Sequence, residues 1–548
     1  MDSDEFDYVI VGSGPAGSVL ANRLSEDGKT TVCVLEAGPP DRNPYLHVPG
    51  GFIKAIHNPN LTWQFQLEPT AYTGGRAITV PQGRTLGGSG SLNGLVYNRG
   101  QRMDYDSWAQ RGNAGWGYAD ILPYFKRSEG RIGHGDDRYR GRDGNLRVTD
   151  VDWIHPVCEA FIDGVTGLGV PRNPDHNAGS QAGVGYYQRI IHRTRRASPG
   201  RAFLHPAMRR QTVDVRTHAH AVGVILDGRR AVGVRYAKGG RGGSTREVRA
   251  RREVIVSAGT VNSARLLQIS GVGPGDLLRE IGVPVVHDLA GVGENFQDHY
   301  SIRFVASVRG VDTINDLARG PKLLWEIGKW VLRQPSILGL SPSVAHIFWK
   351  SDPAFDAPDL QFVFTPASYK ASQTGMLDDF PGMTCGVWQH RPESAGYVRA
   401  KTSDPFTNPK VQPNYLDAEA DRRALLGGMR LVRQYLATPE LAPFYDGEKL
   451  PGPQVESDDD MLAYAYENGT TSFHFVGTCR MGPSTDPTAV VDDQLRVHGL
   501  DGLRVVDASV MPTVPSGNTM APSLMIGEKA ADMIRGRAPL PAADIDSV

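Results

Sequence analysis

A glycine-rich turn near the start of the chain limits the possible folds more than any other feature. An apolar run at residues 8–11 leads into Gly12-Ser13-Gly14-Pro15-Ala16-Gly17. Residues 18–24 then predict a helix, and residues 31–35 predict a second strand that ends at Glu36. In such a βαβ unit the free N–H groups at the helix N-terminus face a pyrophosphate. The sequence therefore predicts a dinucleotide-binding unit at this end of the chain.

Each small residue of the turn has a physical role. Gly12 permits the tight turn, Gly14 lets the backbone approach a pyrophosphate, and Gly17 lets the helix pack closely on the strand. The carboxylate of Glu36 can accept hydrogen bonds from a ribose diol and is unfavourable to a 2′-phosphate, so NADP is disfavoured. NAD and FAD both remain open, and the position of the unit at the very N-terminus favours FAD.

Three later segments have the composition of backbone that approaches a bound group closely. Residues 83–93 are rich in glycine and serine, and residues 252–259 predict a strand that ends in small residues. Residues 503–506 predict another strand, and helices are predicted at 262–270 and 520–534. We expect all of these segments to lie near the dinucleotide.

Length and composition exclude several classes of protein. A chain of 548 residues is too long for one core and predicts two domains. The formal net charge of -1 gives no reason to expect a nucleic-acid partner. The four cysteines are scattered, and there is no CxxC or HExxH motif, so neither a disulfide framework nor a metal site is expected. The acidic N-terminal segment does not resemble a signal peptide, and no run approaches the ~20 apolar residues of a transmembrane segment, so a cytoplasmic protein is expected.

Taken in order, these segments resemble the glucose-methanol-choline (GMC) oxidoreductase family. The resemblance extends over residues 7–533. It rests on the GxGxxG turn with its acidic partner, on GRTLGGSGSLN at 83–93, on SAGTVNSARLLQISGVGP at 257–274, and on HFVGTCRMG at 474–482 followed by Asn518.

The resemblance implies tightly bound FAD and an α/β (α+β) fold. A Rossmann-like FAD-binding domain would be interleaved with a substrate-binding domain built on a mainly antiparallel sheet with helices. The boundaries that we predict are 1–153, 198–300 and 471–548 for the FAD-binding domain, and 154–197 and 301–470 for the substrate-binding domain.

The resemblance also implies contacts with FAD, position by position. Leu92 stands where some members attach FAD through a histidine, and leucine cannot form that bond, so non-covalent FAD is expected. The residues expected to contact FAD are Gly12, Gly14, Pro15, Ala16, Gly17, Glu36, Ala37, Trp63, Gly88, Ser89, Asn93, Val96, Val222, Ala258, Gly259, Asp507, Ala508, Thr519 and Met520.

His474 and Asn518 are the candidates for catalysis. Oxidation of R–CH₂–OH removes a proton from oxygen and a hydride from carbon, and FAD takes the hydride at N5. His474 is suited to be the base because a histidine pKa lies near the operating pH. Asn518 can hold the alcohol oxygen, and the pair can stabilise alkoxide-like charge. Phe475 stands where many members have proline, which affects the expected backbone shape and not the role of His474.

Residues 301–470 are expected to supply the substrate pocket. Predicted strands at 361–365 and 384–390 are candidate walls, and Phe473 is a candidate floor. The amphipathic segment at 322–332, with its two tryptophans, is expected to pack on its own domain, and the alternatives are that it covers the pocket, meets another subunit or touches a membrane. The aromatic candidates for the pocket are Trp63, Trp349, Tyr369 and Trp388.

The leading hypothesis is an FAD-dependent alcohol oxidase or dehydrogenase of the choline-dehydrogenase-like kind. Its substrate would be a small primary alcohol, and oxygen or a quinone-like acceptor would reoxidise the flavin. A monomer or a homodimer is expected. A hydroxynitrile-lyase-like enzyme with non-redox FAD is the alternative, followed by a non-catalytic flavin-binding protein and a nicotinamide enzyme. The motifs identify neither the alcohol nor the acceptor.

Overall fold

The computed structural model describes residues 4–370 and 375–545. The strands of the N-terminal unit belong to a seven-stranded sheet. β1 (Glu5–Val11) and β2 (Val32–Leu35) pair in parallel and are largely apolar and buried, as expected for strands covered on both faces. The remaining strands are β10 (Val213–Arg216), β11 (Ala219–Asp227), β12 (Arg230–Lys238), β13 (Ser244–Val256) and β24 (Leu503–Val505), in the order β10-β2-β1-β13-β12-β11 with β24 beside β13.

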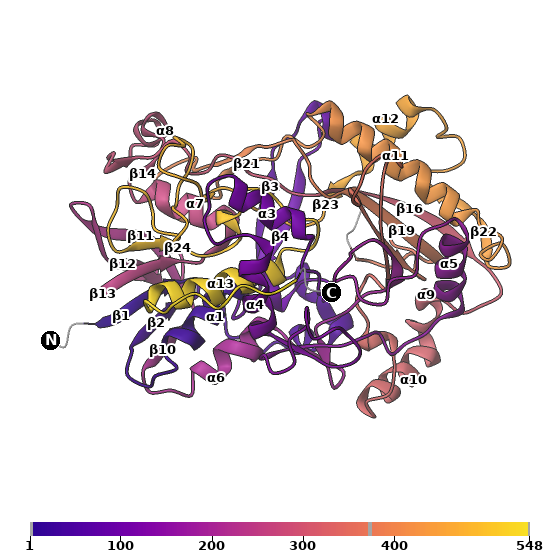
Figure 1. The fold of residues 1–548 in the computed structure, drawn as a ribbon, viewed down its shortest axis with the longest axis horizontal. Helices are drawn as coiled ribbons and strands as arrows, with labels where there is room; N and C mark the ends of the chain where they lie inside the picture. Colours follow the sequence, from indigo (N-terminus) through magenta and orange to yellow (C-terminus); the bar gives the residue numbers. More distant parts are fainter. Residues whose placement is uncertain (1–3, 371–374, 546–548) are drawn as a thin grey trace.

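Helices from both ends of the chain cover this sheet (Figure 1). α1 (Pro15–Leu24) packs on α13 (Met520–Ile534), which has its predicted bounds and also packs on α4 (Tyr118–Ser128). α1 begins at Pro15 and not at residue 18, because the fixed φ of proline suits the first helical position. The other helices near this sheet are α3 (Arg102–Gln110), α6 (His205–Ala207), α7 (Gly259–Ile269) and α8 (Gly275–Glu280).

A second seven-stranded sheet is antiparallel throughout, which confirms the expected mainly antiparallel sheet. Figure 1 shows it on the right, beside α5, α11 and α12. Its strands are β7 (Gly183–Tyr186), β16 (Tyr300–Val308), β17 (Ala345–Trp349), β18 (Leu360–Thr365), β19 (Gly382–Gln389), β22 (Tyr445–Leu450) and β23 (Thr470–Thr471). The neighbouring helices are α5 (Pro156–Gly167), α11 (Glu419–Leu436) and α12 (Asp458–Asn468).

A four-stranded sheet connects segments that we predicted to belong to different domains. Val411 pairs with Leu67 across it, so the sheet contains strands from both sides of the predicted boundary. The predicted division into two domains stays a prediction. The strands are β3 (Thr62–Leu67), β4 (Ile78–Gly83), β20 (Tyr397–Arg399) and β21 (Lys410–Gln412), and short pairs are β5 (Glu129–Arg131) with β6 (Leu146–Val148), β8 (Ile191–His192) with β9 (Arg195–Arg196), and β14 (Val272–Gly273) with β15 (His287–Asp288).

α10 (Gly320–Val331) corrects the expectation that its apolar side packs on its own domain. Leu324 and Trp325 are each 70% exposed, while Glu326 is buried. The Glu326 carboxylate accepts a hydrogen bond from the N–H of Ile337 at 2.9 Å, so the polar side of the helix is tied to the following segment. Within the described residues, no helix is long and apolar enough to cross a membrane.

Candidate active site

One cavity extends from the carboxyl ends of the parallel strands to the antiparallel sheet. The N-termini of α1, α7 and α13 line it, at Pro15, Gly259 and Met520. No side chain among the described residues caps α1 or α13, whereas the carboxylate of Asp507 accepts from the N–H of Gly259 at the start of α7. Free N–H groups and positive dipole ends attract anions, so this end of the cavity fits the pyrophosphate of a dinucleotide.

The glycines of the first turn meet two different requirements. Gly12 has a φ of 100°, and a Cβ at this position would lie 2.3 Å from the carbonyl oxygen of Ser257. A Cβ on Gly17 would lie 2.1 Å from the carbonyl oxygen of Gly12. A Cβ on Gly14 would meet no described atom within 4 Å. Gly12 and Gly17 are therefore needed for packing, whereas Gly14 keeps open a space where a phosphate can approach the backbone.

Two buried carboxylates line the same end of the cavity. Glu36 accepts hydrogen bonds from the N and Oγ of Ser13 at 3.2 and 2.5 Å, and from the N of Gly38 at 2.8 Å. A carboxylate has about four lone-pair positions, so one remains for a ligand hydroxyl. Asp507 accepts from the N of Gly259 at 2.8 Å and fixes the start of α7. Burial raises the pKa of both carboxyl groups above the ordinary value.

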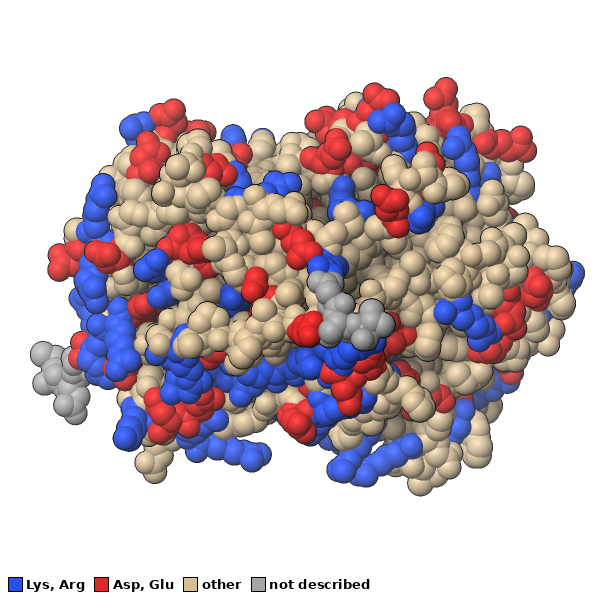
Figure 2. All heavy atoms as spheres, in the orientation of Figure 1, with Lys and Arg blue, Asp and Glu red and all other residues tan. Residues whose placement is uncertain are grey.

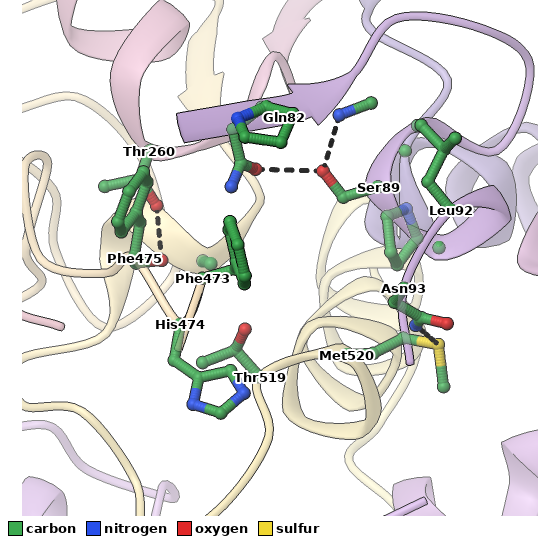
Figure 3. Close-up of a pocket in the computed structure, with 18 of the residues that line it drawn as sticks. Gln82, Ser89, Leu92, Asn93, Thr260, Phe473, His474, Phe475, Thr519 and Met520 are labelled. Atoms are coloured by element: carbon green, nitrogen blue, oxygen red, sulfur yellow. Dashed lines mark hydrogen bonds between the residues drawn. The ribbon is translucent and has the colours of Figure 1, made fainter. Parts of the chain in front are cut away.

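The glycine- and serine-rich loop forms another wall of the cavity (Figure 3). Ser89 Oγ donates a hydrogen bond to Gln82 Oε1 at 2.9 Å. Asn93 Nδ2 lies 3.1 Å from Met520 Sδ, which ties the loop to the start of α13. Leu92 is buried and lines the cavity next to Asn93, so an apolar side chain occupies the position that the resemblance singled out.

Most of the residues predicted to contact the cofactor line this cavity, although no contact with a cofactor tests their roles. Gly17 and Val222 do not line it: Gly17 packs against Gly12, and on β11 the neighbouring Ala221 lines the cavity. The lining residues among those predicted are Gly12, Gly14, Pro15, Ala16, Glu36, Ala37, Trp63, Gly88, Ser89, Asn93, Val96, Ala258, Gly259, Asp507, Ala508, Thr519 and Met520.

Trp63 was a candidate both for the cofactor site and for the substrate pocket. Its ring centroid lies 5.5 Å from that of His220 on β11 and 5.7 Å from the guanidinium carbon of Arg265 on α7. The backbone of β11 begins beside Glu36, because the N–H of Ala219 donates to the Glu36 carbonyl at 2.8 Å. Trp63 therefore lies at the nucleotide end of the cavity.

His474 and Asn518 come together at the other end. Asn518 Nδ2 lies 2.9 Å from His474 Nε2, and both residues line the cavity. Asn518 Oδ1 is buried and has no hydrogen-bond partner among the described residues, so it is available to a ligand hydroxyl. Phe473 also lines the cavity and has a φ of 65°. Bulky residues seldom adopt this left-handed conformation, and such strained residues cluster at functional sites.

Asp298 and His299 form hydrogen bonds to the backbone and to the ring of His474, and the sequence analysis identified neither residue. His299 Nδ1 lies 2.8 Å from His474 Nδ1, and His299 Nε2 lies 2.7 Å from the carbonyl oxygen of His390. Asp298 Oδ1 accepts from the backbone N–H of His474 at 2.7 Å. The available signal was the run Gln297-Asp298-His299, which places three polar side chains directly before the apolar strand β16.

The His390 carbonyl determines where the protons lie. A carbonyl oxygen only accepts, so His299 Nε2 must carry a proton. Burial lowers the pKa of His299 to about 4, so the ring is neutral near pH 7 and its Nδ1 accepts from His474 Nδ1–H. Burial and the adjacent His299 lower the pKa of His474 well below its usual value. His474 is therefore neutral, and the lone pair on its unprotonated Nε2 accepts from Asn518 Nδ2–H at 2.9 Å.

One face of the antiparallel sheet forms the substrate-side wall. The Trp388 ring centroid lies 6.0 Å from that of His474, so this wall reaches the histidine. Tyr369 also lines the cavity, and Trp349 does not. Alternate strand residues point inward, as the period of two requires: Ser301 and Arg303 of β16, Gln361, Val363 and Thr365 of β18, and Thr384, Gly386 and Trp388 of β19.

The described residues offer neither a metal-binding cluster nor a reactive thiol. Residues 4–370 and 375–545 contain no group of three or more His, Cys, Asp or Glu side chains that could hold a metal ion. The four cysteines are free and buried. Burial raises the pKa of each thiol above its ordinary value, which keeps the sulfur protonated and unreactive near neutral pH.

Comparison with known proteins gives concordant similarities. Models of GMC oxidoreductase match residues 6–301 and 392–527. Alcohol dehydrogenase (acceptor) of Pseudomonas putida is 38% identical over 540 residues, covering 98% of this chain and 97% of the relative. Oxygen-dependent choline dehydrogenase of Photobacterium profundum is 37% identical over 540 residues, covering 98% and 94%.

A solved structure extends this similarity to the fold. Pyridoxine 4-oxidase from Mesorbium loti superimposes with a TM-score of 0.88 at 30% identity, covering 97% of this chain and 100% of that chain. The family expected from the sequence motifs is thus confirmed over nearly the whole length. The chain belongs to the GMC oxidoreductase family and is an FAD-dependent oxidoreductase.

Proposed function

We propose that this protein oxidises a primary alcohol to an aldehyde. His474 accepts the hydroxyl proton at Nε2, and Asn518 orients the alcohol oxygen. Bound FAD supplies the acceptor, at its N5 atom, for the hydride that leaves carbon. Oxygen or a quinone-like compound is the proposed final electron acceptor. The names of the relatives, alcohol dehydrogenase and choline dehydrogenase, support an alcohol as substrate.

The unprotonated Nε2 of His474 is the observation that carries this proposal, and the alcohol hydroxyl would replace Asn518 Nδ2–H as its hydrogen-bond donor. This nitrogen lies 2.9 Å from Asn518 Nδ2, at the wall of a cavity that also accommodates a dinucleotide. The bond between the two δ nitrogens of His474 and His299 holds the ring in the tautomer that a base requires. A fixed amide beside the base then stabilises negative charge as it develops on the alcohol oxygen.

The nucleotide end of the cavity is proposed to hold FAD without a covalent bond. Gly14 and the N-terminus of α1 would face the pyrophosphate, and Glu36 has one acceptor position left for a ribose hydroxyl. Leu92 presents only carbon atoms to the cavity, so it offers no atom that could attach to the flavin.

Anaerobic mixing of the holoenzyme with a panel of primary alcohols tests the proposed function. An alcohol that bleaches the flavin absorbance supports alcohol oxidation. Rapid recovery on admission of air, with formation of peroxide, identifies an oxidase, and slow recovery identifies a dehydrogenase with another acceptor. A flavin that dithionite reduces but no alcohol on a broad panel bleaches would contradict the proposal.

We predict that His299→Leu lowers kcat by about 10- to 100-fold, part of the 10²–10⁴-fold that a positioned base contributes. Leucine cannot accept the proton of His474 Nδ1, so His474 is free to adopt the tautomer that lacks a lone pair on Nε2. The measurement is the rate of anaerobic flavin reduction at saturating alcohol.

His299→Gln is the matched control, because its amide can accept from His474 and donate to the His390 carbonyl. We expect it to recover most of the rate. The acid limb of kcat/KM should lie at a lower pH than an ordinary histidine would give, since the lowered His474 pKa keeps the base unprotonated as the pH falls. If His299→Leu and His299→Gln lost the same amount of rate as each other and the same amount of melting temperature, the role of His299 would be purely structural.

A further inference from the structure

The substrate-side wall carries a cation that the proposed reaction does not use. Arg303 lies on the cavity-facing side of β16, opposite Gly386 of β19. It forms no ion pair with any acidic side chain in the part of the chain that the structure describes. The acidic residues that line the cavity are Glu36 and Asp507, both at the nucleotide end.

Gly386 gives the Arg303 side chain its room. A Cβ on Gly386 would lie 3.0 Å from Val363 Cγ2, which is tight, and 3.9 Å from Arg303 Cγ, which is ordinary contact, so the glycine keeps the wall open beside the arginine. Burial lowers the pKa of Arg303, and the neighbours that oppose this shift are the tyrosines Tyr369 and Tyr464 rather than carboxylates. An uncompensated guanidinium that faces a cavity is suited to a carboxylate, because its planar donors match the two carboxylate oxygens.

The separation of the two groups limits the length of the ligand. Trp388, whose ring centroid lies 6.0 Å from that of His474, is two residues from Gly386 on the same strand. Two residues along a strand span about 6.6 Å. Arg303 therefore lies along the wall from His474, which favours a ligand whose anionic group is several carbon atoms from its hydroxyl over a 2-hydroxy acid.

We propose, on the basis of the proposed function, that the natural substrate is a hydroxy acid. Its carboxylate pairs with Arg303, and its hydroxyl lies between His474 and Asn518. The substrate class is then an ω-hydroxy acid or a hydroxymethyl aromatic acid of matching length. A quaternary ammonium alcohol is disfavoured, since it would place a cation beside Arg303 with no acidic side chain among the described lining residues at that end.

Binding of unreactive carboxylates tests the site without turnover. The wild-type holoenzyme is titrated with butanoate, hexanoate, octanoate and decanoate, and the perturbation of the flavin absorbance gives each Kd. Arg303→Met is expected to raise the Kd of the best carboxylate by about 10- to 100-fold, and Arg303→Lys to raise it less. Arg309→Gln, an exposed arginine just beyond the same strand, is the control and should bind as the wild type does.

The kinetic comparison uses ω-hydroxy acids and 1-alkanols of equal length. The wild type should prefer the hydroxy acid in kcat/KM, Arg303→Met should lose that preference, and Arg309→Gln should keep it. Unchanged carboxylate binding in Arg303→Met, or tighter binding of choline than of any carboxylate, would overturn the inference. Oxidation of 1-alkanols with no preference for hydroxy acids would overturn the inference and leave the proposed function intact. Carboxylate binding through Arg303 without any flavin reduction would count against the proposed function.

The exposure of the apolar side of α10 supports a second, independent inference. Most of its apolar side chains and the one just beyond it face solvent, while Leu323 and Trp330 are half-buried, although a helix that packs on a protein surface normally turns its apolar side inward. Exposed apolar surface of this kind marks an interaction site. The exposed residues are Leu324 (70%), Trp325 (70%), Ile327 (39%), Val331 (64%) and Leu332 (71%).

Unpaired cations border this apolar side. Trp330 Nε1 donates to the carbonyl of Thr194 at 2.8 Å, which places Arg193 and Arg195 beside the helix. These two arginines and Arg333 are exposed and form no ion pair with a described acidic side chain. In Figure 2 the surface at the lower right, where Figure 1 places α10, is largely tan with blue side chains at its edge.

We infer that α10 lies flat on a membrane surface that contains anionic lipids. Apolar residues with tryptophan on one side and basic residues at the border are the features of an interfacial helix. A second copy of the chain is a poorer occupant, because a two-fold contact would bring the same arginines of both copies together.

Vesicle co-sedimentation of the holoenzyme tests this second inference. We expect binding to vesicles of phosphatidylcholine and phosphatidylglycerol, weaker binding to phosphatidylcholine alone, and about a tenfold loss in a Leu324→Ser/Trp325→Ser double variant. Leu168→Ser, at an apolar residue that is 53% exposed elsewhere, is the control. Equal binding by the double variant would overturn the inference, as would a wild-type dimer that the double variant converts to a monomer.

Discussion

Alanine in place of His474 is expected to slow alcohol oxidation by about 10²–10⁴-fold while the protein still folds and binds FAD. The substitution removes the lone pair on Nε2 and leaves the alcohol proton without an acceptor beside Asn518. His474 lies at the opposite end of the cavity from Glu36 and Gly14, so the flavin content should not change. The rate of anaerobic flavin reduction measures the loss directly.

His287→Ala is the control, because His287 is a half-buried histidine that does not line the cavity. His287 lies on β15 and hydrogen bonds to the carbonyl of His498 at 2.8 Å. This variant should reduce its flavin at the wild-type rate. If His474→Ala kept its rate within about tenfold, the base would have to be another group. If it lost its flavin as well, its effect would be structural.

The N-terminal unit could be predicted because local rules determine it. The strands at 8–11 and 31–35 are continuous apolar runs, and β1 and β2 pair in parallel along them. The helix at 520–534 also formed with its predicted bounds, since Thr519 and Arg535 flank a long run of good helix formers. In both places the residues that decide the structure are neighbours in sequence.

The hydrogen bonds that orient His474 could not be predicted in this way. His299 and His474 are separated by 175 residues, and their contact depends on how β16 and the C-terminal segment meet. A histidine next to a strand is usually an ordinary core residue, so only the geometry distinguishes His299 from His346. The resemblance to a family supplied His474 and Asn518 but not the residues that orient them.

The orientation of α10 shows a different limit of sequence reasoning. The spacing of Leu324, Ile327 and Val331 predicts an amphipathic helix, but periodicity does not say which side faces the protein. Here the buried Glu326, bound to the N–H of Ile337, decides the orientation. Such a contact pairs a charged group with a backbone donor and cannot be read from hydrophobic spacing.

Valine in place of Gly14 is expected to weaken FAD binding without destabilising the protein. A Cβ at this position meets no described atom within 4 Å, and the backbone there is extended, with a φ of -62°, so the apoprotein can accept the side chain. In the holoenzyme the added methyl groups would occupy the space proposed for the pyrophosphate. Overpacking of about 1–3 kcal/mol corresponds to a Kd for FAD that is about 5- to 150-fold higher.

Comparison with two other glycines makes this prediction specific. Gly12→Ala should lower the melting temperature of the apoprotein, because its Cβ would lie 2.3 Å from the Ser257 carbonyl oxygen at a φ of 100°. Gly328→Val, at an open position on α10, should change neither stability nor FAD binding appreciably. Fluorescence titration of each apoprotein with FAD, together with its melting curve, separates the two effects. A Gly14→Val protein that binds FAD like the wild type would show that the pyrophosphate does not approach this turn, and the cofactor would have to enter the cavity in another orientation.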